Sequence, residues 1–308
     1  MQVDEKNTSE FKLDNSQESL DSVLTTKTNN IKRFLKTLLA RRIVVAGLLV
    51  LLLTILIALF APLIAPYEPN EINLAYSLRS PSSEHILGTD MLGRDVISRI
   101  IYGTRVSLAV GFVSVVIAGS IGMALGLIAG SIGGWMESLI MRWMDVMQSI
   151  PLIVLALFLG SVLGKGLGNV MLAVGIAMVP SYARLTLGQV KSINKLDYVT
   201  AGTISGASKF RNTLVHILPN SISPNIVLMT MNLGFAILIE AALSFLGLGI
   251  NPPTASWGAM VSDGYNHLRT FPVLSIAPGI VIMIVVLAFN IVGDALRDTL
   301  DPRLRGSL

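Results

Sequence analysis

The sequence predicts an all-α, polytopic membrane protein with six membrane-spanning helices. Hydrophobic residues make up 52% of the 308 residues and charged residues only 14%, and the mean hydropathy is +0.69. A soluble domain of this length could not present so little polar surface to water. A helix needs roughly 20 apolar residues to cross a bilayer, and runs of that length recur at about 43–65, 105–130, 138–163, 168–190, 220–246 and 273–294.

These runs divide the chain into four regions. Residues 1–30 are rich in small polar and charged residues and poor in large apolar ones, so we expect a disordered cytosolic tail without a cleaved signal peptide. Residues 31–104 hold the first spanning helix and an extracytoplasmic segment. Residues 105–297 hold the other five spanning helices, and residues 298–308 form a cytosolic C-terminal tail.

Basic residues predict the orientation, because cytoplasmic flanks carry an excess of lysine and arginine. Five stand directly before the first run and three stand at or after the end of the last: Lys32, Arg33, Lys36, Arg41 and Arg42, then Arg297, Arg303 and Arg305. We therefore expect both termini in the cytosol. The connection at 66–104 then lies outside, and the connection between the fourth and fifth helices lies inside.

Prolines and glycines occur inside the predicted helices. Spanning helices tolerate proline where neighbouring helices satisfy the freed backbone groups, and we expect this at Pro151, Pro180 and Pro278. Gly122, Gly126 and Gly130 form a stripe of small residues that lets another helix approach closely. Packing within the chain is favoured for this stripe over a contact with another subunit.

The composition argues against several kinds of site. The chain has no cysteine and only three scattered histidines, a poor set for a metal centre. It has no G-x-x-x-x-G-K-[ST] loop for ATP phosphates, and no converging nucleophile, base and metal ligands that would suggest an enzyme. Its basic residues flank apolar runs, which favours membrane lipid over nucleic acid as a partner. A secondary transporter is an alternative class, although Glu240 alone is thin support for it.

A polar connection, DYVTAGTISGASKFRNTLVHILPN at 197–220, interrupts the apolar runs on the predicted cytosolic side. Asp197 can cap a helix over about 198–205, and Gly206 permits a sharp change of direction. A second short helix is expected over about 207–216, before Leu218 and Pro219 begin the next spanning helix. Two short helices joined at a glycine form a knob that could transmit a push from a cytosolic protein.

The same connection resembles the EAA loop of ABC-importer permeases. Ala201, Gly206, Leu218 and Pro219 match the loop pattern at its spacing, whereas Thr200, Gly202 and His216 stand where Glu, Ala and Ile are usual. The missing Glu removes one charged contact to the ATPase, which Asp197 could supply. The resemblance implies that the loop couples the permease to its ATPase through Asp197, Tyr198, Thr200, Ala201, Gly206, Ala207, Lys209, Arg211, His216, Leu218 and Pro219.

Three further segments, His85–Leu108, Glu240–Met260 and Asp294–Arg305, are similar to the C-type permease subunits of dipeptide, oligopeptide and nickel importers. This resemblance implies the type I ABC importer permease fold and a non-enzymatic subunit that imports di- or oligopeptides across the cytoplasmic membrane of a prokaryote. Nickel or other metal chelates and glutathione are alternative cargoes. The implied partners are a homologous B-type permease, two cytosolic ATPase subunits that bind ATP and Mg²⁺, and an extracytoplasmic solute-binding protein.

Two further sets of residues are candidate sites. Glu240 interrupts an apolar run, and a carboxylate at membrane depth usually faces a cavity, a partner or the interface. It is expected to be either a gate or substrate-path group or a structural hydrogen-bond partner. Asp90, Arg94 and Asp95 lie in a turn-rich extracytoplasmic segment, which predicts either a docking surface for the binding protein or a capped helix start.

Overall fold

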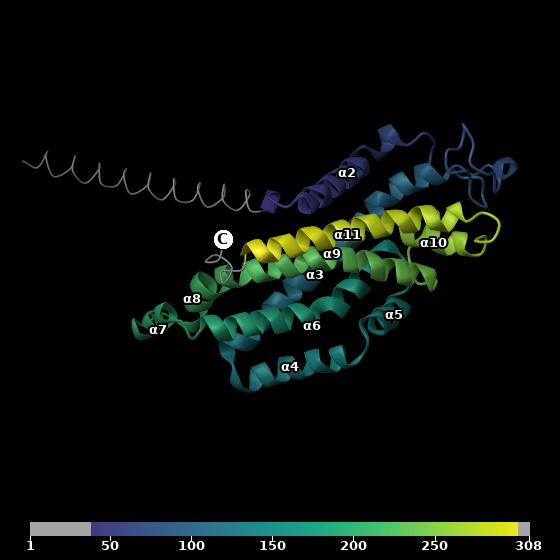
Figure 1. The fold of residues 1–308 in the computed structure, drawn as a ribbon. Coiled ribbons are helices and arrows are strands. Elements are labelled where there is room, and N and C mark those ends of the chain that lie inside the picture. The colour runs from purple at the N-terminus through teal and green to yellow at the C-terminus, as the bar shows by residue number, and fades with distance from the viewer. Residues whose placement is uncertain (1–37, 301–308) are drawn as a thin grey trace, which may run out of the picture.

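The computed structural model describes residues 38–300 (Figure 1), so the predicted tail at 1–30 and residues 301–308 of the C-terminal tail lie outside the described residues. Within residues 38–300, five helices are long and apolar enough to cross a membrane. They are α2 (Arg42–Ile64), α3 (Val96–Ile132), α6 (Leu167–Ile193), the continuous helix that ends with α9 (Leu218–Phe245), and α11 (Val273–Leu300). The shorter elements are η1 (Leu74–Tyr76), α4 (Gly134–Ser149), α5 (Leu152–Leu163), α7 (Asp197–Ile204), α8 (Lys209–Asn212), η2 (Thr213–Ile217) and α10 (Trp257–Tyr265).

The third predicted run, at 138–163, forms two helices instead of one. α4 and α5 meet at an angle of 95°, so the described part of the chain has six candidate crossings only if this bent pair counts as one span. Ile150 is extended, with φ −92° and ψ 129°, because a residue before proline avoids the helical region, and Pro151 has no N–H to continue the helix. The expectation for Pro151 is therefore wrong, whereas Pro180 and Pro278 do lie inside α6 and α11.

α3 and α6 pack at very short range through the glycine stripe. A Cβ atom on Gly126 would lie 2.5 Å from the carbonyl oxygen of Ala183, and one on Gly122 would lie 2.5 Å from the Cβ atom of Tyr182. The largest buried apolar cluster continues from this contact through α3, α5, α6 and α9, with Val110, Leu155, Val174, Tyr182 and Leu243 among its members. This confirms the prediction that the stripe serves packing within the chain.

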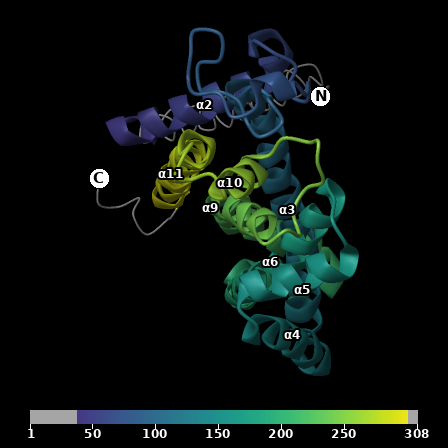
Figure 2. The same cartoon turned by 90° about the vertical axis from the view of Figure 1, so that its right-hand side faces the viewer.

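α9 lies at the centre of the bundle and contacts α3, α6, α10 and α11, whereas α2 lies on the outside beside α11 and α3 (Figure 2). Pro62 in α2 leaves the carbonyl of Ala58 without its helical donor. Arg105 of α3 supplies one, because its Nε donates to the Ala58 oxygen at 2.5 Å and its Nη2 donates to the Leu59 oxygen at 3.2 Å. These bonds attach the largely exposed α2 to the rest of the bundle.

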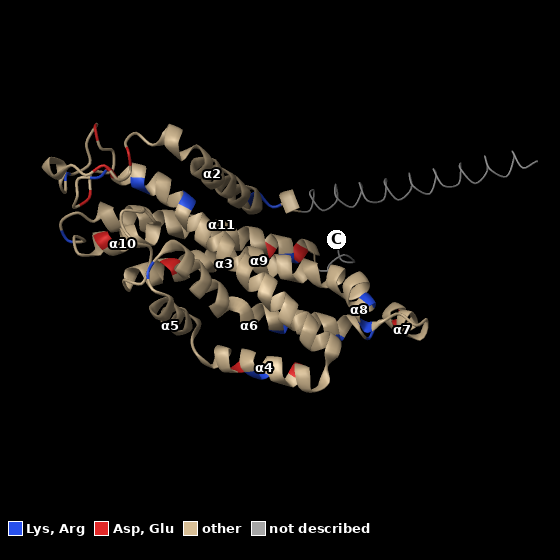
Figure 3. Cartoon of the chain, turned by 180° about the vertical axis from the view of Figure 1, so that it is seen from behind, with Lys and Arg blue, Asp and Glu red and all other residues tan. Residues whose placement is uncertain are grey.

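Most charged residues gather at the two ends of the bundle (Figure 3). One end carries α7, α8 and the start of α2, and the opposite end carries the connection at 65–95 and α10. α4 also carries charges, and these pair with α6: Arg184 donates to Asp145 at 2.6 Å, and Lys191 donates to Glu137 at 2.5 Å. The chain is thus a multi-pass membrane protein with a polar segment at each end.

Candidate functional site

The connection between α6 and α9 folds into two short helices at one end of the bundle (Figure 1). Gly206 lies between α7 and α8 with φ +86°, a conformation that residues with a side chain rarely adopt. The N–H of Ala207 donates to the carbonyl of Gly202 at 3.0 Å, and the Ser208 side chain caps α8 by accepting from the N–H of Arg211 at 3.3 Å. The predicted turn at Gly206 is confirmed, and we call residues 197–217 the α7–α8 knob.

The boundaries of the knob differ from those predicted. Leu196 precedes α7, so Asp197 is its first helical residue instead of its cap, and its carboxylate lies at the favourable end of the helix dipole. The second helix is shorter than 207–216, and it continues through the π-helical turn η2 into α9 without a break. A π turn changes the hydrogen-bond register, so Pro219 follows it without ending the helix. The break predicted near Leu218, between the second short helix and the next spanning helix, is therefore absent.

Buried apolar side chains attach the knob to the ends of the spanning helices. Val199 of α7 and Ile217 of η2 belong to one buried cluster with Val190 and Ile193 of α6, and Leu127 of α3 packs against it. Because α7 and η2 share this cluster with α6, we expect the knob to move together with α6 and α9 as one unit.

Polar and aromatic contacts hold the parts of the knob together. Asn212 of α8 is buried and donates through Nδ2 to the Thr203 hydroxyl of α7 at 3.0 Å. The rings of Tyr198 and His216 meet edge to face, with centroids 5.7 Å apart. The two short helices therefore form one compact unit.

The outer face of the knob combines apolar and basic side chains. Ile204 is 83% exposed and Phe210 is 73% exposed, and exposed Lys209 and Arg211 lie on the same short α8. Thr200 and Ala201 are exposed as well. Ile204 and Phe210 were not among the residues predicted for this site, although large apolar residues on either side of a glycine turn in a polar stretch are a signal that could have found them.

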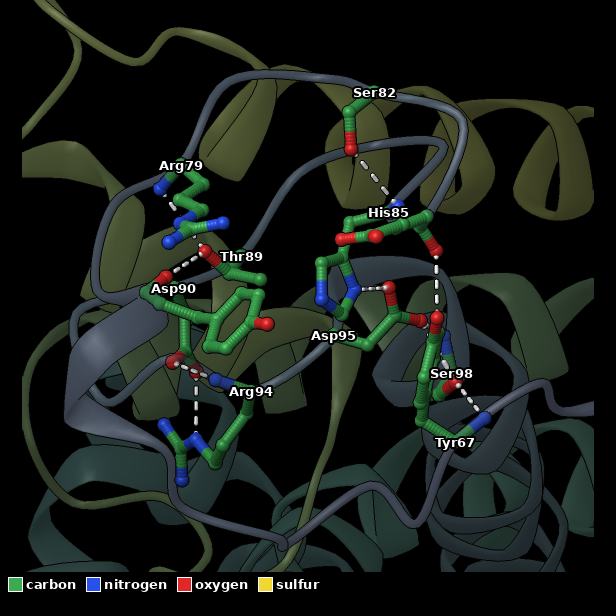
Figure 4. Close-up of polar contacts among 11 residues, drawn as sticks. Tyr67, Arg79, Ser82, His85, Thr89, Asp90, Arg94, Asp95 and Ser98 are labelled. Atoms are coloured by element: carbon green, nitrogen blue, oxygen red, sulfur yellow. Dashed lines mark hydrogen bonds and ion pairs between the residues drawn. The ribbon is translucent and has the colours of Figure 1, made fainter.

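At the opposite end, the three predicted docking residues lie in two neighbouring polar clusters, in which Arg94 and Asp95 are buried and Asp90 is half-buried (Figure 4). Asp95 caps α3 by accepting from the N–H of Ser98 at 2.8 Å, and its other oxygen lies 2.9 Å from Nδ1 of His85. Asp90 accepts from Nε of Arg94 at 2.6 Å and from its backbone N–H at 3.0 Å. These contacts fit the capped helix start, and the docking role stays a prediction.

α6 and α9, which flank the knob, are joined by two pairs of polar side chains inside the bundle. Asn225 Nδ2 donates to the Thr186 hydroxyl at 3.1 Å, and Asn232 Nδ2 donates to the Tyr182 hydroxyl at 2.9 Å. Such bonds between spanning helices stabilise their association because little water competes for the groups. The two helices are thus linked across about one turn of α6 and two turns of α9.

Glu240 lies near the other end of α9 and is 0% exposed. Ser244 of the same helix and Ser256, which caps α10, donate to its Oε1 at 2.8 and 3.0 Å. The carboxylate therefore does not face an open path in this structure, and the hydrogen-bond role predicted for it is the one that the geometry fits. A part in gating stays a prediction.

Comparison with known families identifies the chain over most of its length. The family described as "Binding-protein-dependent transport system inner membrane component" matches residues 122–306, and the family described as "N-terminal TM domain of oligopeptide transport permease C" matches residues 30–81. The first match contains the α7–α8 knob, and the second contains α2 and the start of the connection at 65–95.

Several curated relatives are similar over nearly their full length. The chain is 43% identical to a dipeptide transport system permease protein of Alkalihalophilus pseudofirmus (88% of this chain, 89% of the relative) and 43% identical to a di/tripeptide transport system permease protein of Pseudomonas aeruginosa (90% and 93%). It is also 43% identical to a glutathione transport system permease protein of Pectobacterium atrosepticum (89% and 90%). The predicted resemblance is confirmed, and the chain belongs to the family of binding-protein-dependent transport system inner membrane components.

Proposed function

We propose that the chain is the permease subunit of an ATP-driven importer that carries di- or oligopeptides inward across the cytoplasmic membrane. The observation that carries this proposal is the α7–α8 knob. It is anchored on the spanning helices, and its exposed Ile204 and Phe210 side chains are available to another protein. An exposed apolar surface beside basic residues is typical of a protein docking site. Relatives named for dipeptides and di/tripeptides support the substrate class.

In this mechanism the chain binds no nucleotide, and two cytosolic ATPase subunits bind ATP and Mg²⁺. ATP binding closes the ATPase subunits and displaces the α7–α8 knob. The knob packs on α6, and α6 is joined to α9 by the hydrogen-bonded pairs Thr186–Asn225 and Tyr182–Asn232. Both α6 and α9 therefore move with the knob. The bundle then alternates between inward-open and outward-open states.

The proposal includes an orientation and a set of partners. The knob and both termini face the cytosol, and the Asp90–Asp95 segment faces the outside, where a solute-binding protein delivers the peptide. A homologous B-type permease completes the path through the membrane. Exposed apolar side chains over much of α2 are suited to membrane lipid or to that second permease.

Glutathione is a second candidate cargo. A relative at 43% identity is named for it, and glutathione is itself a tripeptide, so the same path would suit both. Nickel or another metal chelate is a third cargo, which rests on the resemblance in sequence alone.

Copurification tests the central part of this proposal. A tagged chain extracted from its native membranes in mild detergent is expected to bring two ATPase subunits and a second permease with it, and the complex should hydrolyse ATP. A self-sufficient secondary transporter would purify without an ATPase. Recovery of the folded chain alone, under conditions that preserve other membrane complexes from the same cells, would contradict the proposal.

A further inference from the structure

α10 packs across the end of the bundle that lies opposite the α7–α8 knob (Figure 1). Its first residue, Trp257, is fully buried and attaches it to α3: the backbone N–H donates to the Ser107 hydroxyl at 3.3 Å, and the indole N–H donates to the carbonyl of Ile100 at 3.1 Å. Close packing also joins α10 to α9, because a Cβ atom on Gly258 would lie 2.5 Å from the Cα atom of Ala241. α10 also packs along α11, where the Ser275 hydroxyl donates to the carbonyl of Val261 at 2.9 Å, so three spanning helices hold it over the end of the bundle.

The hydrogen bond from Ser256 to Glu240 is the buried polar link between α10 and α9. Ser256 has two roles, because its hydroxyl also accepts from the N–H of Ala259 and so caps α10. Oε2 of Glu240 has no hydrogen-bond partner among residues 38–300, and no ion pair reaches this carboxylate in that part of the chain. Leaving a buried polar oxygen without a hydrogen-bond partner is costly, so this arrangement is poorly explained by stability alone.

α9 connects this link directly to the knob. It is helical over 28 residues from the end of η2 to Phe245, with Pro224 in its second turn, and this corresponds to ~42 Å of helix. Glu240 lies about one and a half turns before its end. A displacement of α9 at the end that adjoins the knob therefore also displaces Glu240. Trp257 meanwhile keeps α10 attached to α3.

We infer that Glu240 is a positioning residue whose bond to Ser256 holds α10 closed over the outer end of the bundle, and that this bond is released when the ATPase subunits displace α9. The inference rests on the proposed function. It assigns to Glu240 a part in closing the extracytoplasmic side without contact with the transported molecule.

The absence of cysteine from the chain allows a direct test with one introduced thiol. Met260 of α10 is buried against Val96 and Leu274, so Met260→Cys reports whether α10 is closed. The thiol is labelled with a membrane-impermeant maleimide from outside in native membranes that hold the full complex, with and without ATP plus vanadate, at equal amounts of chain. Glu240→Leu and Ser256→Gly remove the bond, and glycine is still a fair helix cap.

Two matched variants separate the bond from general destabilisation. Ser244→Ala removes the other donor to the same Glu240 oxygen but leaves α10 attached, and Glu240→Gln keeps an acceptor oxygen. Without nucleotide, Glu240→Leu and Ser256→Gly should label about 3- to 10-fold faster than the parent, as expected for the loss of one buried hydrogen bond. Ser244→Ala and Glu240→Gln should stay within about twofold of it.

The outcomes distinguish this inference from the proposed function. If ATP plus vanadate accelerates labelling of the parent but Ser256→Gly behaves like Ser244→Ala, the role of Glu240 is overturned while coupling to the ATPase survives. If Glu240→Gln labels as fast as Glu240→Leu, the bond is not what holds α10, which also overturns the inference. If the bond-removing variants accelerate labelling and nucleotide does not, Glu240 holds α10 closed but its release by the ATPase is refuted.

Discussion

Replacing Ile204 and Phe210 together with aspartate is expected to abolish binding of the ATPase subunits. Both side chains are largely exposed on the outer face of the α7–α8 knob, and burial of two such side chains contributes ~3–6 kcal/mol to an interface. Two buried charges would add a further penalty. Recovery of the ATPase with the tagged chain should therefore fall more than ~100-fold, as measured by quantitative immunoblotting after copurification.

A matched control uses two other largely exposed apolar residues, at the opposite end of the molecule. Leu74 is 68% exposed and Ile86 is 61% exposed, and both belong to the connection at 65–95. Their double replacement with aspartate should leave recovery of the ATPase unchanged. Equal losses of ATPase recovery in the two double variants would mean that added surface charge disturbs the complex wherever it is placed. Normal ATPase recovery with the Ile204 and Phe210 variant would contradict the docking role of the knob.

Replacing Gly206 with valine should uncouple ATP hydrolysis from transport. A Cβ atom at this position meets no other atom within 4 Å, so the effect comes from the backbone alone. At φ +86°, a β-branched residue costs about 1–3 kcal/mol, which is enough to change the angle between α7 and α8. We expect substrate uptake to fall about tenfold or more, with the chain still present in the membrane.

The control for this variant is Gly206→Asn, because asparagine tolerates a positive φ far better than valine does. Uptake should be close to that of the unaltered chain with asparagine and strongly reduced with valine, while ATP hydrolysis persists in both. Equal uptake in the two variants at equal expression would show that the turn at Gly206 does not matter for coupling.

The spanning helices were predictable where hydrophobicity alone decides them. The runs at 43–65 and 168–190 correspond closely to α2 and α6. α3 begins at Val96 instead of about 105, because Asp95 caps a polar first turn that hydropathy alone would not include. Pro151 divides the third run, and the sequence could not distinguish it from Pro180, since both prolines stand in apolar surroundings.

The candidate site was predictable to the extent that its signals are local. Gly206 and the two short helices follow from residue types that are close together in the sequence. The exposure of Phe210, the contact of His85 with Asp95 and the bond from Ser256 to Glu240 depend on tertiary packing. α10, which supplies Ser256 as its cap, is too short to produce a hydropathy signal, so its place over the bundle could not be predicted.

Peptide uptake tests the central claim most directly. A strain that lacks this gene and other peptide importers is complemented with the chain or with Gly206→Val and is offered a mixed pool of di- to hexapeptides, with labelled glutathione and nickel in parallel. We predict that the unaltered chain restores peptide uptake and that Gly206→Val does not. Restored uptake of nickel alone would refute the peptide assignment, and equal peptide uptake with and without the chain would contradict its role as the permease.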